Sequence, residues 1–284
     1  GYDKDEKGHL IINKEQGKIV RWVFESYMDG INPDVIARNL NERGVPGCMG
    51  EPKWTVATIL SVLENEKHMG DCILQKTYTA DFLTKRMEKN DGHIEQYYIK
   101  NDHDPIIEKD FWNATQMEIA RRRDYMKEHG LRTMGRYTDT QPFSNRVFCG
   151  ECGNVYWRRT LTRLNGSIKV WMCGKRYQQK GVRGCNSESL KEADLHRAFI
   201  MAWNAILENH TEFLPKWKEQ SQSDNPLTAF RARQFIKATE SAEPMRMLDC
   251  ALVSMVFDHC IVQPLGVVEF YFLDGTRIGI ATQE

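Results

Sequence analysis

Four cysteines restrict the fold more than any other feature of the sequence. Cys149 and Cys152 form a C-x-x-C pair within CGECG. Cys173 follows after twenty intervening residues and Cys185 after eleven more. Four thiolates at tetrahedral distance suit Zn²⁺, and a closed set of four protein ligands is typical of a structural site. The spacing therefore predicts one structural zinc ion in a β-ribbon, with Gly150 and Gly153 supplying positive φ angles in the turn.

The main alternative for this pair is a redox-active C-x-x-C motif. Such a motif usually opens a helix within a βαβ unit, and the sequence around Cys149 shows no such pattern. The second cysteine pair lacks C-x-x-C spacing, which makes the generic zinc motif less specific. The remaining cysteines have no partner at ligand spacing and are predicted to be ordinary small side chains: Cys48, Cys72, Cys250 and Cys260.

Charge is distributed unevenly although its formal sum is zero. Residues 121–186 contain 15 Lys and Arg against 4 Asp and Glu, whereas residues 1–120 contain 15 against 21 and residues 187–284 contain 9 against 14. A basic stretch between acidic flanks suits a polyanion, because each phosphate contact releases counterions. The distribution favours nucleic-acid binding, and a solvated basic surface is the alternative.

Helical periodicity dominates the first part of the chain. One helix is expected from Lys14 to Met28, and a second begins at Asn32-Pro33-Asp34 and closes at Gly44. A third helix begins near Trp54-Thr55 after a loop that is rich in Pro and Gly. The three helices resemble a helix-turn-helix with a long turn, whose third helix would face DNA.

The outward positions of this third helix are the candidate base readers. They are Thr55, Thr58 and Ser61, with Lys53 just before the helix. An ordinary three-helix core with a solvated polar face accounts for the same pattern equally well. The sequence does not choose between the two interpretations.

The rest of the chain indicates an α+β protein with two units. Strands are expected over 71–100, a helix over 106–127, a basic linker over 129–145 and a cysteine-bearing β segment over 146–186. Helices are expected over 190–208, 227–239 and 244–258, and a C-terminal hairpin over 267–281. The predicted division is a helical DNA-binding domain with a small β-hairpin (1–128), the linker (129–145) and a zinc ribbon domain with packed helices and C-terminal strands (146–284).

Targeting signals are not visible in the sequence. No apolar run approaches the ~20 residues that a membrane helix needs, and the N-terminus lacks the apolar core of a signal peptide. We expect a cytoplasmic protein with reduced thiols.

Several motifs occur in an order that resembles a known family. GYDKDEKGHLIIN, IVRWVFESYMDG, IARNLNERGVPG, W-x4-IL-x3-EN-x4-GD and HDPIIEKDFW resemble the recombinase domain of large serine recombinases. FCGECG, the two later cysteines and the helix after them resemble that family's zinc ribbon domain. The resemblance covers roughly residues 1–210 and is most specific over 20–70.

The resemblance implies a transposase or phage integrase that binds attachment-site DNA to integrate or excise a mobile element. Such proteins act as a dimer on each site and as a tetramer in synapsis. Their serine nucleophile lies on an N-terminal domain that is expected to precede residue 1, and no Arg-x-Ser motif occurs in this chain. We therefore assign no catalytic residues here. The coiled coil that the family often inserts is not visible over 208–226.

The resemblance also suggests candidate DNA contacts. The linker would lie along the minor groove and present Arg132, Arg136 and Arg146. The ribbon carries more positive charge than a Zn(Cys)₄ site of net charge about −2 requires, which points to DNA contacts by Arg158, Arg159, Lys169 and Arg176. A transcription regulator that pairs a helix-turn-helix with a zinc ribbon is the alternative function, and a zinc-dependent protein–protein module is another.

Overall fold

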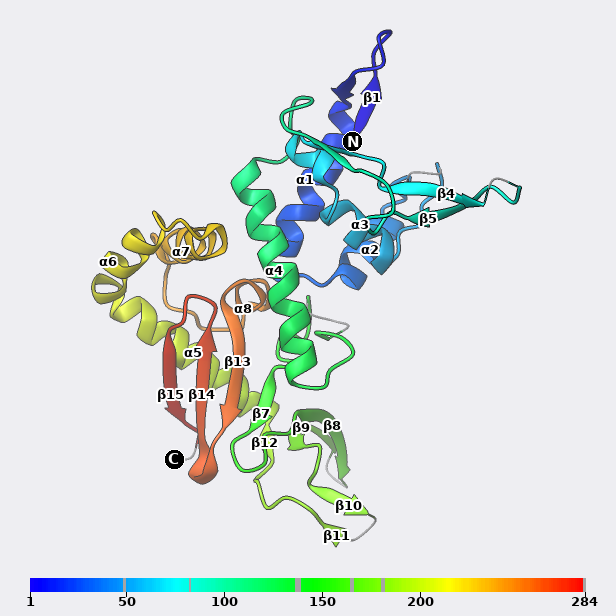
Figure 1. Ribbon diagram of the computed structural model, residues 1–284. Coiled ribbons are helices and arrows are strands. Elements are labelled where there is room, and N and C mark those ends of the chain that lie inside the picture. The colour runs from blue at the N-terminus through cyan, green and yellow to red at the C-terminus, as the bar shows by residue number, and fades with distance from the viewer. Residues whose placement is uncertain (48–49, 82, 136–138, 164–165, 180–181, 283–284) are drawn as a thin grey trace.

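The structure is a mixed α/β fold (Figure 1), and its elements pack around separate hydrophobic cores. It is a computed structural model that describes residues 1–47, 50–81, 83–135, 139–163, 166–179 and 182–282. One core lies among the N-terminal helices, and another lies between the C-terminal sheet, the zinc ribbon segment and the helices that follow it. The expected fold class, α+β with a helical first part and a β-ribbon, is confirmed.

The N-terminal unit is built from helices that begin where capping residues place them. Asn13 accepts hydrogen bonds from the amides of Glu15 and Gln16 and starts α1 (Lys14–Met28). Pro33 occupies the first turn of α2 (Pro33–Glu42), and α3 (Val56–Leu63) follows after the predicted long loop. These helices pack with α4 (Lys109–Glu128), and a short hairpin of β1 (Tyr2–Lys4) and β2 (Leu10–Ile12) precedes them.

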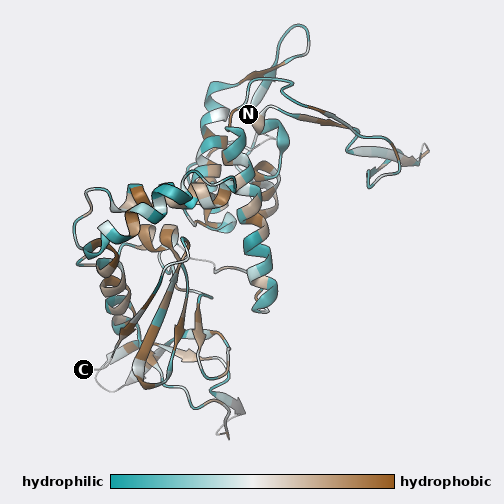
Figure 2. Cartoon of the chain, turned by 60° about the vertical axis from the view of Figure 1, so that its left-hand side comes forward, coloured by the Kyte–Doolittle hydropathy of each residue, from teal (hydrophilic) through white to brown (hydrophobic). Residues whose placement is uncertain are grey.

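A β arm projects from this unit (Figure 2). Within it β3 (Cys72–Leu74) pairs with β6 (Tyr97–Ile99), and β4 (Thr77–Asp81) pairs with β5 (Arg86–Lys89), both antiparallel. Most side chains of the arm are exposed. The sequence predicted strands over 71–100, two or three of them, and the described residues of this segment form four, paired as two short ladders.

The C-terminal unit contains a sheet that joins the two ends of its sequence. Its strand order is β15-β14-β13-β7, and β7 (Val147–Cys149) runs parallel to β13 (Phe257–Val262). β14 (Val267–Phe272) and β15 (Arg277–Ala281) form the predicted C-terminal hairpin. α5 (Glu192–Glu208) packs against β14 and β15.

The predicted ribbon hairpin is β8 (Tyr156–Arg163) with β9 (Gly166–Cys173), extended by β12 (Leu190–Lys191). A second, shorter pair follows, β10 (Tyr177–Gln179) with β11 (Val182–Arg183).

Two elements of this unit differ from expectation. α6 (His210–Gln220) was not predicted because Pro215 lies inside it, yet the buried Trp217 anchors this helix by donating a 2.8 Å hydrogen bond to Asp274. The helix expected over 244–258 is the shorter α8 (Cys250–Val256), and Phe257 begins β13. A short apolar run does not distinguish a helix from a buried strand, and pairing with β7 and β14 decides the outcome.

A buried carboxylate connects the two units. Glu118 of α4 has no exposed surface, and Arg121 and Arg122 of the same helix contact it at 2.8 and 2.6 Å. Arg231 of α7 (Pro226–Thr239) reaches the same carboxylate at 3.2 Å. Arg121 also pairs with Asp258 of β13 at 2.6 Å. The C-terminal unit is therefore held to α4 by charges that are shielded from water.

Helix α7 makes further contacts across this interface. Arg231 donates a 2.9 Å hydrogen bond to the carbonyl of Met28, and Gln234 donates to Asp29 at 3.0 Å. Phe230 packs against Phe111 with ring centroids 5.3 Å apart. The end of α1 and the middle of α4 thus form the surface on which α7 lies.

The segment predicted as a linker packs against both units. Met134 and Phe143 are buried, and the Asn32 side chain donates to the carbonyl of Gly135. Arg38 pairs with Asp139 at 3.1 Å. The described part of 129–145 therefore follows the surface of the protein and is not an extended tether.

Replacement of Glu118 should destabilise this arrangement. We expect Glu118→Gln to lower the free energy of unfolding by ~3–5 kcal/mol, because it leaves buried guanidinium groups without their counter-charge. Denaturant titration of both proteins measures the difference. Glu15→Gln is the matched control, since the Glu15–Lys18 pair is exposed and contributes less than ~1 kcal/mol. Equal losses in the two variants would contradict the proposed role of Glu118.

The contribution of Glu118 should also depend on pH. Burial would raise the pKa of this carboxyl, but Arg231, Arg122 and Arg121 hold it well below its ordinary value. A lowered folded-state pKa means that the stabilisation is complete above the unfolded pKa of about 4.3 and is lost as the pH falls toward the folded value. The difference in free energy of unfolding between the wild type and Glu118→Gln should therefore be constant around neutral pH and should decrease below about pH 4.3.

Candidate metal centre and nucleic-acid interface

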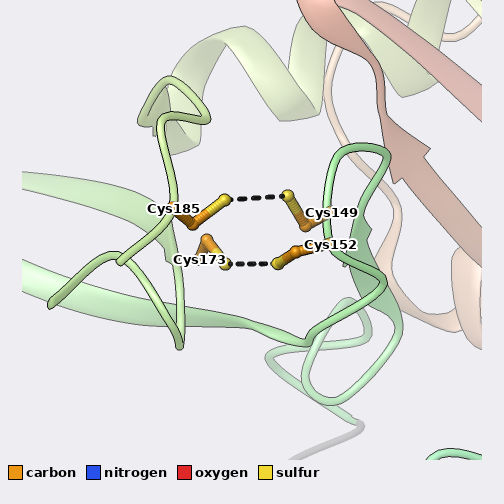
Figure 3. Close-up of side chains that lie close together, drawn as sticks. All are labelled: Cys149, Cys152, Cys173 and Cys185. Atoms are coloured by element: carbon orange, nitrogen blue, oxygen red, sulfur yellow. Dashed lines mark hydrogen bonds between the residues drawn. The ribbon is translucent and has the colours of Figure 1, made fainter. Parts of the chain in front are cut away.

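The four predicted cysteines converge at one point of the fold (Figure 3). Their sulfur atoms all lie within 4.8 Å of one another, with 3.8 Å between Cys149 and Cys185 and 3.4 Å between Cys152 and Cys173. Zinc with Zn–S bonds of ~2.3 Å places its sulfur ligands roughly 3.8 Å apart. The donor set and its spacing therefore fit a tetrahedral zinc ion.

Local backbone geometry explains why the chain turns here. Gly153 has a φ of 69°, as predicted, and its amide donates to the carbonyl of Cys149 at 2.8 Å. Gly150 serves another purpose than the one expected: its φ is not positive, but a Cβ at this position would overlap the side-chain oxygen of Gln263. Its amide donates to the carbonyl of Val262 at 2.9 Å. Gly150 thus lets the turn lie directly against β13.

The surroundings of Cys149 favour a thiolate. Burial would raise the pKa of its thiol, but hydrogen bonds from Ser187 and from the backbone amides of Glu151 and Cys152 lower the pKa below its ordinary value. Amides that point at sulfur are the expected outer contacts of a zinc knuckle. Outside this cluster, Cys72 and Cys260 are buried and Cys250 is half-buried, while Cys48 lies outside the described residues.

The candidate base readers on α3 form the N-terminal cap of that helix. Thr55 accepts a hydrogen bond from the amide of Thr58 at 3.2 Å, and Thr58 donates its hydroxyl to the carbonyl of Thr55 at 2.8 Å. These hydroxyls therefore stabilise the helix itself. Ser61 is exposed one turn further along, and Lys53 is exposed and pairs with Glu51 at 3.1 Å. Ser61 is the candidate whose loss would least disturb the helix.

One predicted DNA contact is corrected by the structure. Arg146 is only 3% exposed, and its guanidinium donates to the carbonyl of Phe257 at 3.0 Å. It lies beside Arg122 and Tyr125, inside the interface that joins the two units. In this fold Arg146 is a buried structural residue and cannot reach a phosphate.

The other basic candidates divide into engaged and exposed side chains. Arg158 forms a bidentate ion pair with Glu192, and Arg176 donates to the carbonyl of Ser187 at 2.8 Å. The exposed candidates among the described residues are Arg132, Arg159 and Lys169. Arg136 lies outside the described residues. The basic surface is therefore smaller than the count over 121–186 implies.

An exposed tryptophan was missed by sequence reasoning. Trp157 lies on β8 next to Arg158 and is 46% exposed. The signal was present in YWRRTLTR, where two aromatic residues directly precede two arginines on one strand. Alternation places Trp157 and Arg159 on the same face of the ribbon.

Two family models match the chain in this order. One described as Recombinase matches residues 14–122, and one described as Recombinase zinc beta ribbon domain matches residues 142–204. The first match covers most of the helical N-terminal unit, and the second covers the zinc ribbon and most of α5. The resemblance inferred from the sequence motifs is thereby confirmed over both segments.

Relatives agree with this assignment. A protein of Bacillus subtilis (strain 168) described as "Putative DNA recombinase" is 24% identical over 231 residues, which make up 78% of this chain. The chain spans 44% of the length of that relative.

Two solved structures align with nearly the whole chain. One, described as "Crystal Structure of a LSR-DNA Complex", has a TM-score of 0.48 and 16% identity over 96% of this chain and 92% of its own. Another, described as "Sequence Requirements of the Listeria innocua prophage attP site", has a TM-score of 0.44 and 14% identity over 96% of this chain and 89% of its own. Among the described residues, no helix combines the length and the apolar character needed to span a bilayer.

Removal of the metal should affect one unit more than the other. We expect elemental analysis to find one zinc ion per chain. Either Cys173→Ser or a strong chelator should abolish zinc binding and unfold the ribbon, because structural zinc contributes directly to folding. Hydrogen exchange should then increase over 147–191 while α1 to α3, which have their own core, stay protected. Cys250→Ser is the control, since Cys250 lies outside the cluster. A metal-free ribbon with unchanged protection would refute a structural zinc.

Proposed function

We propose that this chain binds the attachment-site DNA of a mobile element as the C-terminal part of a site-specific serine recombinase. The observation that carries the proposal is the order of its two family domains, a recombinase domain followed by a recombinase zinc ribbon domain. The exposed cations Arg132, Arg159 and Lys169 support a polyanionic partner.

Within this proposal, Zn²⁺ is held by Cys149, Cys152, Cys173 and Cys185. A closed set of four sulfur ligands leaves no open coordination position, so the ion would fix the ribbon and supply no chemistry. The basic β8–β9 hairpin extends from this site. The metal would thus position the ribbon for DNA rather than react with it.

We further propose that residues 1–128 and 146–284 are two DNA-binding units joined by 129–145. Separate hydrophobic cores support two units, and the buried contacts of Glu118 and α7 limit their relative motion. The candidate readers in the first unit are on α3, and those in the second are on the ribbon. In the whole protein, the serine nucleophile would lie on another domain, and two copies would bind one site before a tetramer joins two sites.

Selection of DNA from a random pool tests the proposal. The chain should enrich a defined duplex motif, and log K should fall linearly with log salt, with a slope of about −0.9 for each phosphate contacted. The contacted length should include two separated segments, one for each unit. Enrichment of no motif, together with salt-independent or absent binding, would refute sequence-specific DNA recognition.

Sequence choice and overall affinity should depend on different side chains. If Ser61 contacts a base edge, Ser61→Ala should weaken binding to the selected duplex by roughly 1–3 kcal/mol and leave binding to random DNA unchanged. If Arg159 contacts phosphate, Arg159→Gln should weaken binding to both the selected and the random duplex and reduce the salt slope by about one unit. Lys4→Gln, at an exposed site on β1, is the control and should change neither.

Affinities of each variant for both duplexes across a salt series provide the measurement. Equal loss on both duplexes for Ser61→Ala would contradict base reading by α3. A loss confined to the selected duplex for Arg159→Gln would instead make the ribbon the reader, since Arg–guanine pairs are the commonest specific contacts.

A further inference from the structure

A cavity lies where the end of α4 meets the zinc knuckle. It measures about 470 Å³, within the range of small-ligand sites, and is open to solvent. Part of the lining comes from the segment directly after α4, which contributes His129, Leu131 and Arg132. The rest includes Gly153 to Val155 of the knuckle and Trp157 of β8. The cavity thus brings together the predicted linker and the ribbon that follows it.

The charge of this cavity sets it apart from the rest of the surface. None of the described residues that line it is Asp or Glu, although the chain contains 39 acidic residues. Arg132 is exposed there, and no ion pair among the described residues involves it. Burial lowers the pKa of His129, so near pH 7 its neutral ring still carries one N–H donor. An anion would find donors in the lining itself, while the carboxylates of Glu128 and Asp258 lie near enough to His129 to oppose the lowering of its pKa.

The indole of Trp157 is fixed in place by the backbone beneath it. A Cβ on Gly174 would lie 2.5 Å from Nε1 of Trp157 and 2.6 Å from Oδ1 of Asn154, so the indole edge rests directly over this glycine. Leu131 and Val155 continue the apolar lining. An aromatic ring and a guanidinium that line the same cavity can hold a sugar or base together with its own phosphate.

We propose that this cavity binds one phosphodiester unit of DNA, with the phosphate on Arg132 and His129 and the adjoining deoxyribose or base against Trp157. The inference rests on the proposed DNA binding and names a contact that the linker arginines alone do not provide. Because the lining comes from the segment directly after α4 and from the zinc ribbon, one nucleotide in the cavity would fix the position of the ribbon on DNA relative to α4.

The test uses a duplex selected by the wild-type chain and a series in which each phosphate in turn is a neutral methylphosphonate. We expect Arg132→Gln to weaken binding about tenfold and to reduce the salt slope by about one unit. At one position, the methylphosphonate should weaken DNA binding by the wild type by a similar factor. The same substitution should cause no further loss of affinity for Arg132→Gln, because the two changes remove the same contact. Arg246→Gln, at an exposed arginine outside the basic stretch, should behave as wild type.

Trp157 provides an independent measurement. Trp157→Ala should weaken binding about tenfold with an unchanged salt slope, and Trp157→Phe should restore most of the affinity by keeping an aromatic face. Zinc content and circular dichroism show whether the ribbon is intact. If Trp157→Ala loses zinc, the coupling between Arg132 and the methylphosphonate position decides the question.

The outcomes separate this inference from the proposed function. Absence of DNA binding by the wild type overturns both. Salt-dependent binding without any methylphosphonate position coupled to Arg132 overturns the cavity alone. Inorganic phosphate at constant ionic strength distinguishes a backbone phosphate from a free anion: if millimolar phosphate abolishes the coupling, the cavity is a free-phosphate site and the DNA assignment is wrong.

Discussion

The buried carboxylate of Glu118 is the interaction on which the arrangement of the two units depends. Arg121, Arg122 and Arg231 all pair with it, and Arg146 lies in the same interface. Guanidinium groups that are removed from water repel one another strongly unless a counter-charge lies between them. Glu118, assisted by Asp258, supplies that charge. Much of the basic character of the central segment therefore holds the protein together and is not available to a partner.

The candidate metal site depends on the same interface indirectly. Cys149 ends β7, and β7 is held in the sheet by its parallel pairing with β13. Strand β13 also carries Asp258, which pairs with Arg121. The cysteine cluster, the C-terminal sheet and helix α4 are thus joined through one strand, so a change at any of them is transmitted to the ribbon that carries Arg159 and Trp157.

Local patterns predicted the elements well, and tertiary pairing accounts for what they missed. The capping residues Asn13 and Pro33 marked the starts of helices, and the cysteine spacing identified a cluster that the fold brings together. The sequence could not reveal that Phe257 leaves a helix for a strand, because β13 pairs with β14 and with β7, and β7 lies more than a hundred residues earlier in the chain. Trp217 anchors α6 in spite of Pro215 for the same kind of reason.

Candidate DNA contacts were harder to predict than the fold. Arg146 and Arg159 look equivalent in a count of charges, yet one is buried beneath Phe257 and the other is exposed on the ribbon. Thr55 and Thr58 have polar side chains because they cap α3, a role that a helical pattern does not separate from base reading. Burial and hydrogen bonding decide such questions, and both depend on segments that are distant in sequence.

The parallel pairing of β7 with β13 has a consequence for how the chain is made. Cys149 pairs with Val262, so the strand that presents the first cysteine has no neighbour in its sheet until the chain has been synthesised beyond that residue. At ~5–20 residues per second this interval is on the order of ten seconds. Contacts of such long sequence separation also form slowly once the chain is complete. During that interval β7 lacks its partner in the sheet, so the ribbon takes its final position against the C-terminal sheet only after β13 has left the ribosome.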